Sequence, residues 1–330
     1  MKAIAPMAPS ARLTAFESCR ADLVALAYRM LGDMGRAEDM VQETWLRWAG
    51  QPVAPDSPRA YLVTIVTRLC LNELDSARAR REESRADRLP EPVDLEVGGL
   101  SRVEHLEAIS MAFLVMLQRL SPAERAVLLL RDVFDFEHQE IAALVGTKVP
   151  ACRKLLERAR KHVAEERRLL SARPDEHRRL LQAFLRAATA GDVGGLAAIL
   201  ADDAVMVSDG GPEGRTVAGQ RNLPRPLQGA ARIAAFVAAA TARGAQVLRT
   251  EQRDLNGRPA VVFLSEGRPF AALLLAVAGG KIQRVYFHAD AGRLGRLRPP
   301  DPDAAPAAAP STAGSTPDST QRGMPAGRVV

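Results

Sequence analysis

The chain has 330 residues, 47% of them hydrophobic, with 45 lysines and arginines against 39 aspartates and glutamates. That size allows more than one packed core, and a net charge of +6 suits a polyanionic partner without requiring one. Three cysteines without CxxC spacing and five histidines without a ligand pattern argue against a disulfide framework and structural zinc, so no metal and no cofactor are expected. The longest apolar run, 270–278, is too short to cross a bilayer. Since no secretory pattern follows Lys2, we expect a cytoplasmic protein without a membrane partner.

Residues 11–84 are predicted to form a helical domain, because apolar positions recur at helical spacing and glycines are few. In the segment RAEDMVQETWLRW one stripe is expected to be buried: Ala37, Met40, Val41, Thr44, Trp45 and Trp48. The opposite side presents Asp39, Gln42, Glu43 and Leu46. A leucine among polar residues suits a helix-docking surface, but single exposed leucines are common. The spacing alone therefore leaves a partner surface and a solvated surface equally open.

The next helix is expected to begin at Ser57-Pro58, an N-cap residue followed by proline. Its core stripe is Leu62, Ile65, Val66 and Leu69. It ends in a cluster without an intervening acid, formed by Arg78, Arg80 and Arg81. Such a cluster at a helix C-terminus is usually a solvated end that the helix dipole favours. Beside a second DNA-binding module, it indicates contact with phosphates.

A linker at 85–101, containing RLPEPVDLEVGG, separates this domain from a second helical domain at 102–170. The second domain contains a strong helix start, in which Ser121, Pro122 and Glu124 form a capping box with proline at the first helical position. We therefore expect a helix with a firmly defined N-terminus at Ser121.

The helices that follow predict a helix-turn-helix. A short helix is expected at 137–144, and Gly146 permits the sharp turn into the next helix. Between Lys148 and Arg168 that last helix holds eight lysines or arginines against three glutamates. This charge suits a recognition helix lying beside DNA phosphates. A solvated basic helix in an ordinary bundle is the alternative.

A third domain is expected at 174–296, and it differs in character from the first two. Helices are expected at 175–190, 193–200 and 229–243. Hairpin signals stand at Asn256-Gly257, Glu266-Gly267 and Gly279-Gly280. They predict a meander with one face covered by the helices, and its strands are 246–254, 260–265, 269–278 and 281–287. Residues 297–330 are rich in proline, alanine, serine and threonine and are expected to form a disordered tail.

The stretch DMGRAEDMVQETWLR, then SPRAYLVTIVTRLCLNELDSARARRE, then the helix-turn-helix resembles an extracytoplasmic-function (ECF) sigma factor of bacterial RNA polymerase. The resemblance covers about the first 170 residues. It implies docking on the clamp helices of core RNA polymerase through Asp39, Gln42, Glu43 and Leu46. It further implies that promoter DNA around the −10 element faces Arg68, Asn72, Arg78, Arg80 and Arg81, and that the helix-turn-helix reads the −35 element.

The recognition helix is expected to enter the major groove with its N-terminal residues nearest the base edges. The base-edge candidates are Lys148, Ala151, Arg153 and Lys154. The phosphate candidates are Arg158, Arg160 and Lys161. Helix phase decides which of Arg153 and Lys154 points at the bases, and the sequence leaves both open.

The chain further resembles the SigJ-like subgroup, in which a SnoaL-like domain of the NTF2 superfamily follows the sigma domains. The subgroup's WLPEP linker stands here as Arg88 followed by Leu89, Pro90, Glu91 and Pro92. Its DGGG motif stands as Asp209, Gly210 and Gly211, with Pro212 in place of the third glycine. The asparagine-proline-aspartate motif stands as His288-Ala289-Asp290. The resemblance implies two all-α sigma domains, an α+β cone, and control in cis through contact between the cone and the sigma core.

Other functions are weighed against this one. The acid/base candidates of the third domain are Asp202, Asp203, Asp209, His288 and Asp290. On a strand, His288 and Asp290 would share a face, but no spacing identifies a reaction, so no catalytic residue and no enzymatic activity are expected. A small-molecule ligand in a concave apolar cone is left open. The alternatives for the whole chain are a helix-turn-helix repressor with a ligand-sensing domain and an enzyme with an attached DNA-binding regulator.

Overall fold

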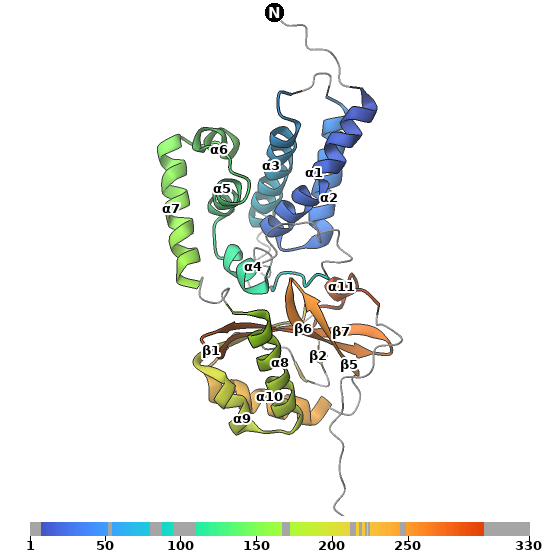
Figure 1. Cartoon of the computed structure of the whole chain (residues 1–330), viewed down its shortest axis with the longest axis vertical. Helices are drawn as coiled ribbons and strands as arrows, with labels where there is room; N and C mark the ends of the chain where they lie inside the picture. The colour runs from blue at the N-terminus through green and yellow to red at the C-terminus, as the bar shows by residue number, and fades with distance from the viewer. Residues whose placement is uncertain are drawn as a thin grey trace, which may run out of the picture.

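The structure is a computed structural model that describes residues 8–51, 55–79, 88–94, 110–166, 172–211, 216–217, 220–221, 223, 225–244 and 249–299. A helical part lies on one side of a β-sheet, and further helices lie on the other side (Figure 1). Some expectations fall on residues outside those described: Arg80, Arg81, Pro212 and nearly all of the tail expected at 297–330.

The first helical domain contains α1 (Pro9–Leu31), α2 (Met34–Ala49) and α3 (Pro58–Ala79). Gly32, with φ of 68°, ends α1, and the Asp33 side chain caps α2 by accepting a hydrogen bond from the Arg36 amide. The expected stripe of α2 is confirmed: its members are buried or half-buried. The Trp48 indole donates to the Arg12 carbonyl oxygen at 3.1 Å, which fastens the end of α2 to α1.

The second helical domain contains α4 (Met111–Gln118), α5 (Pro122–Asp132), α6 (His138–Val145) and α7 (Val149–Glu166). The capping box at the start of α5 is confirmed, because the Ser121 and Glu124 side chains each accept from the other residue's amide. Gly146 has φ of 73° and ends α6 in the left-handed conformation that the sharp turn needs.

The two helical domains share one hydrophobic cluster instead of packing two separate cores. The cluster runs from Phe16 and Trp48 of the first domain to Leu129 and Val163 of the second. Helix α3 contacts α5 and α6 directly. Arg125 of α5 is buried, and its guanidinium donates to the carbonyl oxygens of Met30, Leu117 and Leu120. Burial lowers the pKa of Arg125 to about 10, and the group keeps its charge at neutral pH.

The third domain is built on a mixed sheet with strand order β4-β1-β8-β7-β6-β5. Its strands are β1 (Leu200–Asp209), β4 (Leu227–Gln228), β5 (Arg249–Leu255), β6 (Arg258–Ser265), β7 (Arg268–Ala278) and β8 (Lys281–His288), with a separate pair β2 (Thr216–Val217) and β3 (Gln220–Arg221). The predicted meander is confirmed as β5 to β8. All six residues of the three predicted turns have positive φ, as type I′ hairpins require. The strand β1 adds to the meander by pairing parallel to β8.

The two faces of this sheet have different neighbours (Figure 1). The helices α8 (Pro174–Thr189), α9 (Val193–Ile199) and α10 (Ala230–Gly244) cover one face, as expected. Leu89 of the linker and Met111 of α4 pack on the other face, near the short helix α11 (Ala291–Leu294). The sheet therefore serves both as the core of its own domain and as a platform for the linker. Among the described residues, no helix combines the length and the apolar character needed to span a bilayer.

Candidate functional site

The predicted polymerase-binding residues lie on the side of α2 that faces away from the core. Asp39, Gln42 and Leu46 are exposed, and Leu46 retains 59% of its accessible surface. Glu43 is half-buried and pairs with Arg47 one turn later, at 2.9 Å between Oε1 and Nε. The buried stripe on the other side of α2 fixes the rotation of the helix, so these four side chains form one contiguous surface.

The predicted −10 residues are brought together only in part. Arg68 and Asn72 are exposed on α3, one turn apart. Arg78 lies in the last turn of α3, but its side chain, like Arg80 and Arg81, falls outside the described residues. Helix α3 also contacts α5 and α6, so the second helical domain packs against the helix that carries this surface.

The predicted −35 residues all lie on the solvent side of α7: Lys148, Ala151, Arg153, Lys154, Arg158, Arg160 and Lys161 are exposed. The opposite side of α7 is buried through Cys152, Leu156 and Ala159. Arg160 pairs with Asp132 at 2.6 Å, and this hydrogen bond raises its pKa above the ordinary arginine value. Arg158 lies 3.3 Å from Glu124. Both phosphate candidates therefore have carboxylate partners in this structure.

The linker and the DGG segment, predicted to act together, are in direct contact. The Leu89 amide donates to Asp209 Oδ2 at 3.0 Å, and the Leu89 carbonyl accepts from Arg293 Nη1 at 2.5 Å. Gly211 has φ of 78°, and a Cβ at this position would lie 3.0 Å from the Asp290 carboxyl carbon. The close approach of Asp290 and the positive φ together explain why glycine is needed here.

At this contact a residue that departs from the subgroup's pattern meets one that keeps it. Arg88, which stands where tryptophan is usual, forms an ion pair with Asp290 of the His288-Ala289-Asp290 segment. The expectation that His288 and Asp290 share a strand face is wrong, because β8 ends at His288 and Asp290 caps α11. The Asp290 carboxylate thereby has two structural tasks, a helix cap and an ion pair.

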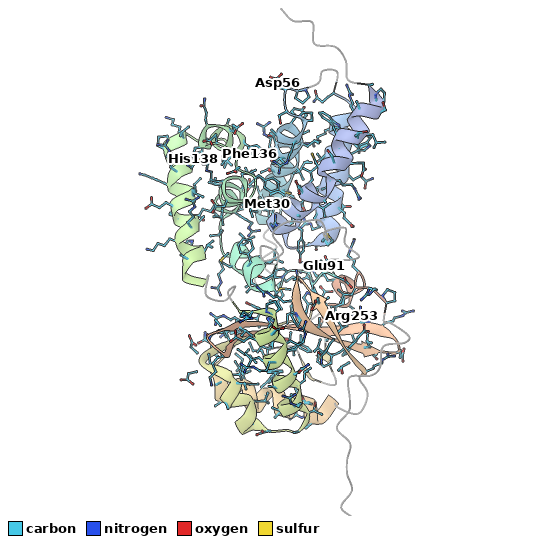
Figure 2. All side chains as sticks on the ribbon, in the orientation of Figure 1. Met30, Asp56, Glu91, Phe136, His138 and Arg253 are labelled. Atoms are coloured by element: carbon cyan, nitrogen blue, oxygen red, sulfur yellow. The ribbon has the colours of Figure 1, made fainter. Side chains whose placement is uncertain are left out.

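Among the described linker residues 88–94, Glu91 is the most deeply buried acid, and it lies at the boundary between the helical part and the sheet (Figure 2). Its Oε2 accepts from the Met34 amide at the start of α2, at 2.7 Å. Its own amide donates to the Gly32 carbonyl, and its carbonyl accepts from the Tyr28 hydroxyl at 2.5 Å. Burial raises the pKa of Glu91 to about 7, against the effect of the Met34 hydrogen bond.

Several residues of this contact were not predicted as functional. Asn256 was expected only to form a hairpin turn, but its side chain donates to Tyr28 Oη at 2.8 Å and accepts from the Val93 amide at 3.1 Å. Arg293 and Arg296 extend from the end of the third domain to Asp33 and Glu38 of the first. No local signal in the sequence marks them, since each depends on a partner more than 150 residues away. The contact surface, defined by residues 88–94, Tyr28, Asn256, Arg293 and Arg296, is called the linker seam below.

Of the acid/base candidates, Asp209, His288 and Asp290 lie close enough to interact electrostatically. Asp202 and Asp203 are exposed on β1. His288 is fully buried, and neither ring nitrogen has a hydrogen-bond partner among the described residues. Burial lowers the pKa of His288 to about 4, so the ring is neutral at physiological pH.

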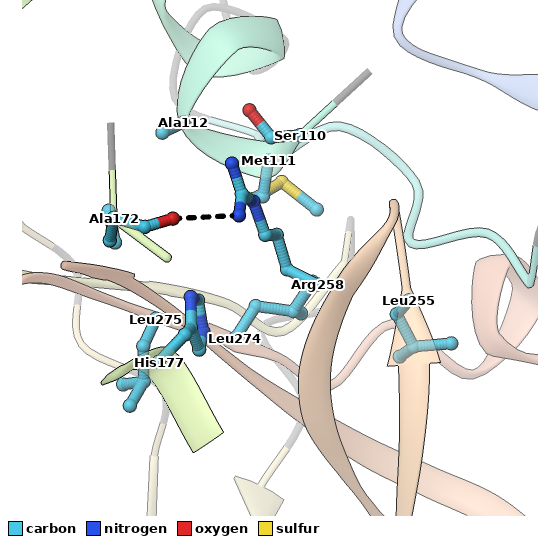
Figure 3. A pocket seen from close by; sticks show the side chains of 10 residues that line it. Ser110, Met111, Ala112, Ala172, His177, Leu255, Arg258, Leu274 and Leu275 are labelled. Carbon is cyan, nitrogen blue, oxygen red and sulfur yellow. Dashed lines mark hydrogen bonds between the residues drawn. The ribbon is translucent and has the colours of Figure 1, made fainter. Parts of the chain in front are cut away.

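A small cavity lies where α4 and α8 meet the sheet (Figure 3). His177 and Arg258 line it, and Arg258 donates to the Ala172 carbonyl at 3.0 Å. Its volume of about 10 Å³ is enough for a water molecule but not for an organic ligand. On the face of the sheet that α8, α9 and α10 cover, Leu181, Phe184 and Ile233 are part of the packed core.

Comparisons with known proteins agree with this geometry. Residues 15–80 match the family model for sigma-70 region 2, and residues 110–163 match that for sigma-70 region 4. The chain is 33% identical over 288 residues to the probable ECF RNA polymerase sigma factor SigI of Mycobacterium tuberculosis, covering 86% of this chain and 95% of that protein. It is 35% identical over 229 residues to the ECF RNA polymerase sigma factor SigJ of the same organism, covering 67% and 70%.

A solved structure extends the similarity to the third domain. The crystal structure of Mycobacterium tuberculosis SigJ superimposes with a TM-score of 0.66 at 26% sequence identity, covering 87% of this chain and 100% of the SigJ chain. Both helical domains and the helix-covered sheet thus have counterparts in one solved sigma factor. From the family matches, the length of the similarity and the order of its domains, this chain belongs to the extracytoplasmic-function sigma factors of RNA polymerase.

Proposed function

We propose that this sigma factor binds the clamp helices of core RNA polymerase through the exposed face of α2, and that it does so in the cytoplasm. Leu46 is the apolar centre of that face, with Asp39 and Gln42 beside it. Interfaces gain most of their affinity from a few apolar or aromatic side chains that become fully desolvated, surrounded by polar residues. The combination of an exposed leucine with a polar rim supports this assignment over a merely solvated helix.

We propose that α7 reads the −35 element and α3 contacts DNA near the −10 element. Arg153 and Lys154 lie near the N-terminus of α7, where a recognition helix meets base edges, whereas Lys161 lies three turns from its start and suits a phosphate. Arg68 and Asn72 would face the −10 DNA. Binding, not chemistry, is the mechanism, because a sigma factor acts by placing polymerase on DNA.

The two helical domains pack against each other, an arrangement called closed below. This packing supports a regulatory step in which the two domains separate before promoter binding. The −10 and −35 elements lie about 25 base pairs apart, which corresponds to ~85 Å of B-DNA at ~3.4 Å per base pair. Helix α7 has 18 residues and a length of ~27 Å. Since α3 touches α5 and α6, both domains cannot reach their elements at once in this arrangement. Promoter binding therefore requires the domains to separate.

We propose that the third domain controls this step in cis through the linker seam. The observation that carries the proposal is that the linker backbone hydrogen-bonds to the first helical domain at Gly32 and to the third domain at Asp209 and Asn256. A linker held on both sides cannot extend until these bonds break. Contact between the third domain and the sigma core thereby favours the closed arrangement.

Run-off transcription with purified core polymerase tests the proposal, using the full chain and a truncation after Arg173. We expect transcription that depends on the added protein, and a different level with the truncation because the closed arrangement is released. Equal levels from both forms would exclude control by the third domain. Failure of both forms to bind core polymerase would instead favour a repressor with a ligand-sensing domain, a function that the family membership disfavours.

A further inference from the structure

Where the linker seam meets the start of α2, carboxylates outnumber cations. Three carboxylates meet there: Asp33 caps α2, Glu38 lies in its first turns, and Glu91 reaches in from the linker. They share two guanidiniums of the third domain, Arg293 and Arg296. Because Arg293 also lies 3.9 Å from Asp290, the cluster cannot neutralise every carboxylate at once.

Of the three carboxylates, Glu91 is the one whose charge is least well balanced by an arginine. Arg296 donates from Nη1 to Glu38 at 2.7 Å, but its Nε lies 3.7 Å from Glu91 Oε1, beyond a normal hydrogen bond. That Oε1 is buried and has no hydrogen-bond partner among the described residues. A buried carboxylate oxygen without a partner is costly when charged, whereas a protonated carboxyl group avoids most of this cost.

We infer that Glu91 is a pH-sensitive latch: its protonation tightens the docking of the linker on the first and third domains, and its ionisation loosens it. The latch acts on the docking proposed above and therefore rests on it. It sits at the first turn of α2, beside the polymerase-binding face, and Arg296 crosses the same turn close to Gly35. Through this turn the pH of the solution affects how firmly the third domain is held against the polymerase-binding helix.

The groups facing Glu91 respond differently to pH. From α1, Tyr28 is buried and its pKa is raised, so the phenol stays neutral. From α2, the facing groups are the Asp33 carboxylate and the Met34 amide; from the third domain they are Arg293 and Arg296. His288, on the other side of the linker, has a pKa of about 4 and is neutral throughout the range in which Glu91 titrates. Glu91 is thus the group that changes charge near neutral pH.

The direction of the effect follows from linkage. The pKa of Glu91 is about 7 in the docked linker and returns to the ordinary 4.5 when the linker is released. Docking is therefore strongest below 4.5, weakens as the pH rises through 7, and levels off about one pH unit above that value. One-proton linkage with these two values predicts that the docking equilibrium falls about tenfold between pH ~6 and pH ~8.

Hydrogen exchange of the full chain measures this equilibrium directly. The amides of Leu89 and Val93 donate to side chains of the third domain, so they are protected only while the linker is docked. After correction for the intrinsic rate, we expect their protection factors to fall about tenfold from pH ~6 to pH ~8. In Glu91→Gln, which keeps an acceptor for the Met34 amide without the charge, we expect equal protection at both pH values.

Glu38→Gln is the matched control, because Glu38 pairs with the same Arg296 but is exposed at the surface. It should keep the wild-type pH dependence. A wild-type protection factor independent of pH, or an unchanged slope in Glu91→Gln, would overturn the latch while leaving the docked linker in place. No protection of these amides at any pH would overturn the docking itself together with the latch. The pH dependence of the wild-type protection factors tests the latch even if a variant folds poorly.

Discussion

Asn256→Gly tests how strongly the linker seam is held. Asn256 has φ of 53°, a conformation that glycine adopts without strain, so the substitution removes the side chain and leaves the turn intact. The hydrogen bonds to Tyr28 and to the Val93 amide are lost, and the buried Val93 N–H is left without this acceptor. A lost hydrogen bond costs ~1 kcal/mol and an unsatisfied buried donor ~1–3 kcal/mol. We expect docking to weaken by ~2–4 kcal/mol, since both partners lie outside the third domain.

The measurement is amide exchange of residues 88–94 together with thermal unfolding. At ~1.4 kcal/mol per factor of ten, the protection of the Leu89 amide should fall by roughly 30-fold to 1000-fold. Glu266→Gly is the matched control, since Glu266 also has positive φ at a hairpin turn but is exposed. It should leave the protection unchanged. Equal protection in both variants would refute the reasoning, because it would mean that the Asn256 side chain contributes nothing to docking.

Further predictions concern the other contacts. Leu46→Ala should weaken binding to core polymerase by ~1–2 kcal/mol in a titration, whereas Leu13→Ala, also an exposed leucine, should not; equal effects would argue against the α2 face. Arg125→Met removes the guanidinium hydrogen bonds to three buried backbone carbonyls and should lower the free energy of unfolding by ~2–5 kcal/mol in urea denaturation, with a change below ~1 kcal/mol speaking against the interdomain role. Arg153→Ala should relax promoter choice at one position, while Lys161→Ala should weaken all promoters alike and reduce the salt dependence of binding; losses independent of sequence in both would remove the distinction.

The departure from the subgroup's linker motif at Arg88 has a physical explanation in its contact with Asp290, the aspartate that the third motif retains. Arg88 and Asp290 stand 202 residues apart and form an ion pair, which neither position reveals alone. A tryptophan at position 88 would offer no charge to Asp290, and an arginine would be costly there without a carboxylate. In this chain the Arg88–Asp290 ion pair therefore holds one end of the linker, and the LPEP residues that follow Arg88 are buried.

Local features were predicted well, because nearby residues determine them. The capping box at Ser121 and the glycine turn at Gly146 depend only on residues within one helical turn. The same holds for the type I′ turn at Asn256-Gly257. The parallel pairing of β1 with β8 was not predicted, because it joins Met206 to Val285 across most of the domain and leaves no local signal.

The sequence by itself determined the order of the modules, the exposed faces of α2 and α7, and the family to which the chain belongs. These depend on helical periodicity, turn chemistry and motif order, all of which lie along the chain. Only the tertiary structure decided that the two helical domains share a core, that the linker is held on both sides, and that Glu91 has a pKa of about 7. Burial and ionisation depend on the groups that surround a side chain in space, and for Glu91 those groups come from both ends of the chain.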